Sequence, residues 1–268
     1  MYYKSIETNK ITFTDARFYR SENGTWIPSV TTILEAYPKP YELLQWMKEQ
    51  GSNADKIKEA AGKRGSIVHE LTERYDKLNP GERIELLDSF DNPNYSLFDE
   101  WAMFERYVDF STRFNPLNYL IEESIVSTNL NIAGTIDRIC EINGERYIVD
   151  IKTSNGIYPS YWLQLAAYRK LYYDWAQKDL YTIEDLDAIA VDGCAILWLN
   201  AKTKTNGKSG DIQGPGWQLI IKDNDFMNEQ YKIFECVKQV WLAEHPNDKP
   251  KQYCFQTSYE KPLKEVLA

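Results

Sequence analysis

A two-residue turn, Asn143-Gly144, fixes the strand pairing in the middle of this chain. Asn-Gly between runs rich in β-branched residues is the strongest short-range signal of a β-hairpin, because both central residues of a type I′ turn need φ > 0. Counting outward from this turn predicts that Asp137 lies directly across from Asp150. Side chains at directly opposite positions share one face of a sheet with Cβ atoms about 5 Å apart, and like charges there repel each other.

Lys152 adds a third charge to the same place. Side chains alternate along a strand, so Lys152 is expected to point to the same face as Asp150. Two carboxylates and an ammonium group therefore converge. A folded chain rarely keeps such an arrangement unless a cation neutralises it, and the hairpin predicts a divalent-metal site.

The composition is that of a soluble globular protein of 268 residues, with 43% hydrophobic and 26% charged residues. No apolar run approaches the ~20 residues that span a bilayer. The N-terminus lacks a signal-peptide core, so we expect a cytoplasmic protein with no membrane contact. The net charge of −9 argues against general affinity for nucleic acid, although it leaves room for a local basic channel. One candidate cluster for such a channel lies on a predicted helix and comprises Lys56, Lys58, Lys63 and Arg64; the other comprises the loop lysines Lys202, Lys204 and Lys208. Either cluster alone is more often a solvated charged face.

The order of elements predicts one α/β domain over residues 1–268, with a central mixed β-sheet flanked by helices and an N-terminal helical portion. Residues 1–115 hold a hairpin and helices, 116–245 the catalytic core and 246–268 a C-terminal tail. The hairpin is expected over 11–27, and Ser29 is expected to cap a short helix. Further helices are predicted at about 41–50, 53–78, 95–113, 159–178 and 224–244, and strands at about 119–127, 132–142, 145–152, 190–200 and 217–222.

Four more residues are candidates for the site. His69 lies on the predicted helix 53–78; a lone histidine on a helix is more often structural, but its coincidence with a two-Asp site favours a ligand. Gln164 and Tyr168 are i,i+4 neighbours on the helix after the Asp150 strand, from which they could reach Lys152 or a phosphate. Glu122 or Glu123 could add a carboxylate; strand parity does not decide between them, and Glu122 is the preferred candidate.

These residues, in this order, resemble the PD-(D/E)XK nuclease superfamily in its RecB-like branch. The likeness extends to exonucleases of mitochondrial genome maintenance and their phage and bacterial relatives. The matching motifs span about residues 28–170: Pro28-Ser-Val-Thr-Thr-Ile-Leu34, Arg64-Gly-x-x-x-His69, Gly134-x-x-Asp137, Asp150-x-Lys152-Thr-Ser and Gln164-x-x-x-Tyr168.

The resemblance implies a restriction-endonuclease-like core that binds one or two Mg²⁺ or Mn²⁺ ions. It implies metal ligation by His69, Asp137, Asp150 and the backbone carbonyl of Ile151. It implies a catalytic role for Lys152 beside Asp137 and Asp150. Gln164, Tyr168 and Glu122 are further catalytic candidates from their own positions, and nucleic-acid contacts are expected from Lys63, Arg64 and Ser66. Relatives with an iron–sulfur cluster carry one early cysteine and three late ones. No cysteine here precedes Cys140, so no cluster is expected, and the scattered cysteines also argue against structural zinc or disulfides.

The expected function is a metal-dependent DNA exonuclease acting on single-stranded or free ends in replication, repair or recombination, in a bacterial or phage-infected cell. Three alternatives stay open: a structure-specific endonuclease or restriction enzyme, an accessory subunit that needs a helicase or recombination partner, and a non-catalytic nucleic-acid-binding protein. In the last case Asp137, Asp150 and Lys152 would form only a structural ion-pair group.

Overall fold

A computed structural model describes residues 3–5, 10–12, 16–89, 98–177, 189–201 and 215–246. Its centre is a five-stranded sheet in the order β5-β6-β7-β8-β9. Only the β7–β8 pair is parallel among these strands, so the sheet is mixed, as predicted. The strands span Leu117–Ser127 (β5), Ile132–Ile142 (β6), Glu145–Lys152 (β7), Gly193–Trp198 (β8) and Gln218–Asp223 (β9).

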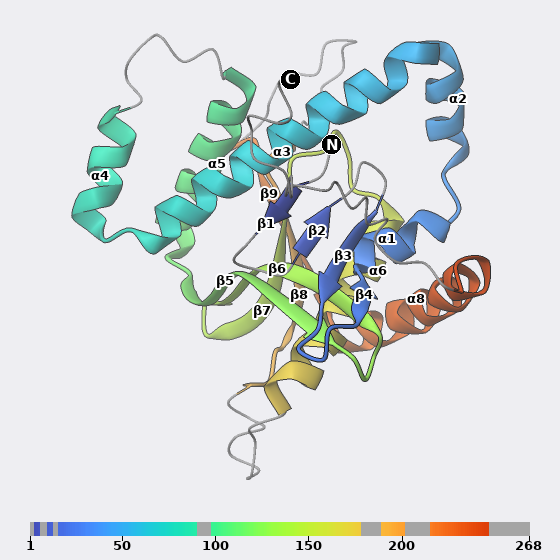
Figure 1. Cartoon of the computed structure of the whole chain (residues 1–268). Helices are drawn as coiled ribbons and strands as arrows, with labels where there is room; N and C mark the ends of the chain where they lie inside the picture. Colours follow the sequence, from blue (N-terminus) through green and yellow to red (C-terminus); the bar gives the residue numbers. More distant parts are fainter. Residues whose placement is uncertain are drawn as a thin grey trace, which may run out of the picture.

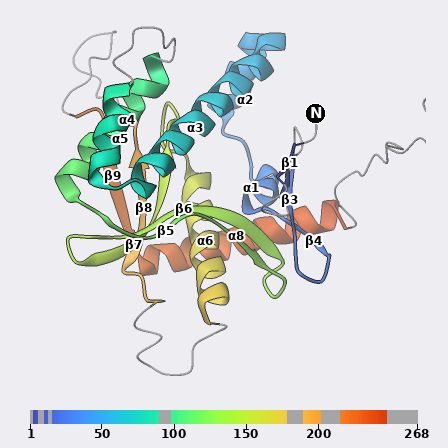
Figure 2. The ribbon, with the colours of Figure 1, turned by 60° about the vertical axis from the view of Figure 1, so that its left-hand side comes forward.

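Helices cover both faces of this sheet (Figures 1 and 2). One face packs against α3 (Ala54–Lys77), α4 (Pro80–Ser89) and α5 (Phe98–Phe114), and buries alternate β7 residues such as Val149 and Ile151. The other face packs against α1 (Val30–Ile33), α6 (Pro159–Ala176) and α8 (Asn224–Glu244), and buries Ile148 between them. Because side chains alternate along β7, Asp150 and Lys152 belong to the α6 side. The predicted α/β architecture is confirmed.

The predicted hairpin turn is also confirmed. Asn143 and Gly144 have φ of 56° and 87°, and the pairing of β6 with β7 starts at Ile142 and Glu145. None of the helices within the described ranges is both long and apolar enough to cross a membrane.

The N-terminal region is more elaborate than the predicted hairpin. It forms a separate antiparallel sheet of four strands: β1 (Tyr3–Ser5), β2 (Lys10–Thr12), β3 (Arg17–Arg20) and β4 (Trp26–Pro28). The buried Tyr19 of β3 shares a 2.9 Å hydrogen bond with Thr135 of β6, which ties the small sheet to the large one. Ser29 caps α1 by accepting the Thr32 N–H, as predicted, and a 3₁₀ turn, Leu34–Ala36, follows.

One helix is not among the predicted elements. No helix is predicted between residues 78 and 95, yet α4 begins at Pro80. Asn79 Oδ1 accepts a hydrogen bond from the Glu82 N–H, and the Glu82 carboxylate accepts one from the Asn79 N–H, both at 3.0 Å. This is a capping box with proline at the first helical position, where its missing N–H costs nothing.

The remaining helix, α2 (Tyr41–Gln50), has no buried residue, and a 3₁₀ turn, Gly51–Asn53, joins it to α3. The loop lysines Lys202, Lys204 and Lys208 and nearly all of the predicted tail lie outside the described residues.

Candidate active site

The site lies where strands β6 and β7 separate. Their ladder runs from Ile142↔Glu145 to Arg138↔Val149, and its next step would pair Asp137 with Asp150. Within these fully described strands that step is not made. Instead, Asp137 Oδ2 accepts the backbone N–H of Ile151 at 2.8 Å. The Asp137 side chain thus takes the place of a backbone hydrogen-bond acceptor between the two strands. The strands diverge here, and we call this point, where the buried Asp137 and Asp150 lie, the fork.

Lys152 and Gln164 surround the Asp150 carboxylate. Lys152 Nζ lies 2.7 Å from Asp150 Oδ2, as expected for neighbours on one face of β7. Gln164, reaching down from α6, donates to Asp150 Oδ1 at 3.2 Å and accepts from Lys152 Nζ at 3.1 Å. One amide therefore fixes the positions of both charged groups relative to each other.

His69 reaches the same fork from the opposite face, on α3. Its Nδ1 lies 3.1 Å from Glu122 Oε1 and 3.7 Å from Asp137 Oδ1, while its Nε2 lies 3.1 Å from the Ile151 carbonyl oxygen. Both ring nitrogens face acceptors, so both carry protons in this state. The imidazolium stands between the oxygen atoms that a cation would bind.

Glu122 has an unusual backbone. Its φ is 50° in the middle of β5, where a side chain other than glycine is strained. The β5–β6 pairing includes Ile121 and Glu123 but skips Glu122 and its partner position Asp137. The distortion turns the Glu122 carboxylate into the site, whereas Glu123 is exposed. Strain of this kind gathers at functional sites, where surrounding contacts hold it in place.

The electrostatics follow from burying several like charges together. Burial opposes the charged form of His69, but Asp137 and Glu122 outweigh it and raise its pKa to about 9. Burial also raises the pKa of Asp150, to about 6 despite the opposing effect of Lys152, and raises that of Asp137. For Lys152, burial is outweighed by Asp150 and Asp137, so its pKa is raised and the ammonium form is favoured.

The donor set suits a hard divalent cation. One ligand atom from each of His69, Glu122 and Asp137 lies within 4.8 Å of the others. The Ile151 carbonyl is in contact with His69, and Asp150 Oδ2 is buried with an ion pair but no well-aligned hydrogen bond. Carboxylate and carbonyl oxygens favour Mg²⁺, and the imidazole makes Mn²⁺ acceptable.

Comparison with known proteins agrees with this geometry. A family model described as the PD-(D/E)XK nuclease superfamily matches residues 43–183, a span that contains His69, both aspartates, Lys152 and Gln164. The chain belongs to the PD-(D/E)XK nuclease superfamily. Membership implies a nuclease that uses divalent metal ions and acts on nucleic acid. A search of curated proteins found no match.

A buried arginine next to the site, Arg138, is not among the residues that the sequence predicts. Arg138 Nε donates to Asp76 Oδ2 at 2.6 Å, and its Nη atoms donate to the Asp137 carbonyl, Thr72 and Glu122. Tyr107 of α5 donates to the same Asp76 oxygen. A signal was present: His69, Thr72 and Asp76 are spaced i, i+3, i+7 and form a polar stripe on the half of α3 that packs on the core through Val68 and Tyr75.

Tyr168 packs against β6, and the predicted nucleic-acid-binding residues lie on α3. The buried Tyr168 ring packs on Gly134, where an added Cβ would come within 2.4 Å of Cε1; no hydrogen bond to Lys152 is found among the described residues. Lys63, Arg64 and Ser66 lie on α3 one to two turns before His69. There Lys63 pairs with Glu59 at 2.9 Å, and Ser66 donates to the Gly62 carbonyl.

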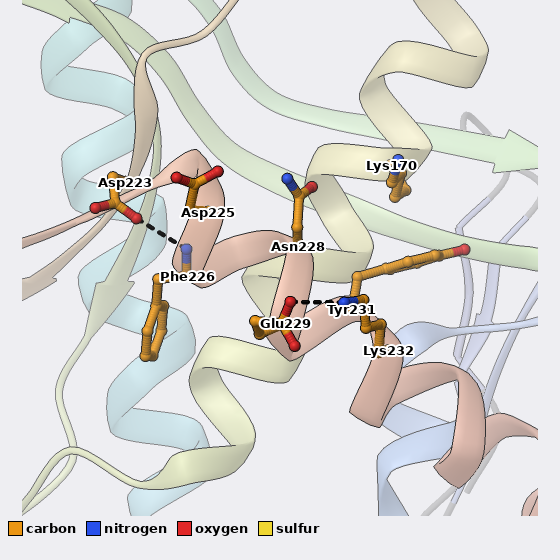
Figure 3. A pocket seen from close by; sticks show the side chains of 8 residues that line it. All are labelled: Lys170, Asp223, Asp225, Phe226, Asn228, Glu229, Tyr231 and Lys232. Carbon is orange, nitrogen blue, oxygen red and sulfur yellow. Dashed lines mark hydrogen bonds and ion pairs between the residues drawn. The ribbon is translucent and has the colours of Figure 1, made fainter.

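An open pocket between α6 and α8 is separate from these residues (Figure 3). Two of its acidic residues, Asp223 and Glu229, have partners within α8. Asp223 caps α8 by accepting the Phe226 N–H at 2.8 Å, and Glu229 pairs with Lys232 at 2.6 Å.

Proposed function

We propose that this protein is a metal-dependent exodeoxyribonuclease that hydrolyses phosphodiester bonds at single-stranded DNA ends with Mg²⁺ or Mn²⁺. The observation that carries the proposal is the meeting of Asp137, Asp150 and Lys152 at the fork of β6 and β7. A superfamily match over the same residues supports it.

Each polar group has a proposed role. The cation would be held by Asp137, Asp150, Glu122, His69 and the Ile151 carbonyl. When bound, it polarises the scissile phosphate and activates water. Lys152, as an ammonium group, orients the attacking water and offsets the negative charge that develops on the phosphate oxygens. Gln164 keeps Lys152 and Asp150 at their working separation.

The preference for strand ends rests on the arrangement of α2 and α3. The first half of α3 extends past the sheet together with α2 (Figures 1 and 2), and every residue from Asp55 to Ala60 is exposed. Lys63 and Arg64 lie on this arm, and Ser66 and His69 follow on the same helix. By analogy with the family, a helical cover of this kind favours a single strand threaded from its end. Action beside a helicase or recombination partner in replication, repair or recombination is part of the same proposal.

A time course on end-labelled single- and double-stranded DNA with Mg²⁺, Mn²⁺ or EDTA tests the proposal. We expect mononucleotides or short products from linear single strands with either metal, and none in EDTA. Circular single-stranded DNA should stay intact, because it has no end. Cleavage of the circle at a comparable rate would instead identify an endonuclease.

A further inference from the structure

Two tyrosines form an aromatic pair at the start of α6, Tyr158 at its N-cap and Tyr161 in its first turn. Tyr158 is 42% exposed, and Tyr161 is partly buried against the core below α6. Their ring centroids lie 5.4 Å apart with an interplanar angle of 83°, an edge-to-face contact. Single exposed aromatic side chains are common on protein surfaces, so exposure alone carries no functional argument.

The pair borders the proposed cleavage centre. Lys152 Nζ lies 4.5 Å from the centroid of the Tyr161 ring, in a cation–π contact, and 2.7 Å from Asp150 Oδ2. Tyr161 thus contacts both Lys152 and Tyr158, so one ring links the exposed Tyr158 to the lysine of the proposed cleavage centre.

The segment that joins β7 to α6 is held firmly by the end of β8. Trp198 Nε1 donates to the Ser154 carbonyl at 2.7 Å, and Leu199 N–H donates to the Lys152 carbonyl at 2.8 Å. Asn200 donates to the Asn155 side chain at 3.1 Å. The chain that leads to Tyr158 is thus fixed before any ligand arrives, which lowers the entropic cost of binding.

Tyr158 brings little to the stability of the fold. It occupies the N-cap of α6, where Ser, Thr, Asp or Asn would accept a helical N–H, and its side chain makes no capping bond. It also belongs to none of the buried apolar clusters. An exposed ring at a position that favours a small polar residue calls for another explanation.

From these contacts we propose that Tyr158, supported by Tyr161, stacks on an unpaired base of the nucleotide next to the scissile phosphate. The proposal rests on the nuclease function and names its substrate class. A base inside a duplex is stacked on its neighbours and cannot offer a free face to a side chain. The strand must therefore be unpaired at this point, and stacking tolerates all four bases because each has a π-face.

Binding without cleavage gives the first test. Fluorescein-labelled oligothymidylate is titrated with protein in EDTA, and anisotropy reports Kd for Tyr158→Leu, Tyr158→Phe and Tyr158→Trp. We expect Leu to weaken binding about 5- to 100-fold, with Phe and Trp close to wild type. The slope of log Kd against log salt should not change, because no phosphate contact is lost. Tyr119→Leu is the matched control, since Tyr119 is 45% exposed but lies on β5 and donates to Glu141.

A scan with a single abasic nucleotide locates the contact. With metal present, wild type should lose kcat/KM at one position of the abasic site near the cut, and Tyr158→Leu should lose nothing further there. A Leu variant that binds and cleaves like wild type overturns the proposal, as does a loss that is equal at every abasic position. If wild type binds DNA without cleaving it, the nuclease function fails while the anisotropy series still decides the stacking role. Absence of any DNA binding overturns both.

Discussion

Asp137 and Arg138 are neighbours on β6, but they belong to two different groups of buried charged residues. The two groups differ in how fully their charges are paired within the protein. Arg138 makes four hydrogen bonds, and the side chains of Arg138 and Asp76 are only 2% and 1% exposed. In the other group His69 and Lys152 keep 28% and 16% of their side-chain surface exposed.

The difference separates a structural group from a functional one. Around Arg138 the positive charge is enclosed by partners from α3, α5 and β5, and nothing can enter without breaking the fold. At the fork, three carboxylates face Lys152 and His69, which remain partly exposed, and one of the three, Glu122, is shared with Arg138. A buried ion pair is weak evidence for function by itself, whereas perturbed pKa values in an accessible acidic group point to a ligand site.

The largest expected effect is the loss of cleavage activity in Asp150→Asn, at the fork. The neutral amide keeps the shape but removes a charge that the cation and Lys152 both need, so metal-dependent cleavage should fall about 100-fold or more. The circular dichroism spectrum should match wild type. Asp109→Asn is the control, because Asp109 lies on α5 and pairs with Arg113. Near-normal cleavage by Asp150→Asn would exclude Asp150 from the chemistry.

Arg138→Met should show the opposite pattern, with loss of stability as the primary effect. It leaves Asp76 buried without its cation, and breaking a buried pair in this way costs about 3–5 kcal/mol. Urea denaturation measures the free energy of unfolding through the midpoint at constant m. Arg113→Met removes an exposed i,i+4 pair with Asp109 and should cost less than about 0.5 kcal/mol. Similar midpoints for the two variants would show that the Arg138 group does not hold the fold.

Much of this contrast could be predicted from sequence, and the missed part has a physical reason. Asn143-Gly144 fixed the register, and the alternation of side chains then placed Asp137, Asp150 and Lys152 together. Local rules of this kind do not give the partner of a buried charge on another element. Arg138 finds Asp76 62 residues away, and only the packing of α3 on the sheet brings them together. The direction in which the Glu122 side chain points could not be predicted from the sequence either, because it depends on a positive φ inside a strand.

The packing of β6 against Tyr168, next to the charged residues at the fork, can be tested at Gly134. Gly134→Ala would bring a Cβ to 2.4 Å from the Tyr168 ring, so the ring or the strand must move. Overpacking of this kind costs about 1–3 kcal/mol, which thermal unfolding would measure. Gly144→Ala is an informative comparison, because nothing lies within 4 Å of its added Cβ and its cost arises from φ of +87° alone. Restoration of the Gly134→Ala stability by Tyr168→Leu would identify the clash as the cause.

The smallest effect should come from Gln164, which acts through its neighbours. Gln164→Ala removes the bonds to Asp150 and Lys152 but leaves their 2.7 Å ion pair in place. Each lost hydrogen bond to a charged group is worth about 1.5–3 kcal/mol at most, and water entering the space left by the side chain recovers part of it. We expect kcat to fall about 10-fold with KM unchanged. Gln164→Glu should be more harmful, because a further carboxylate adds to the surplus that distinguishes this group from the one around Arg138. If Glu is tolerated better than Ala, the fork does not carry excess negative charge, and the contrast between the two groups is lost.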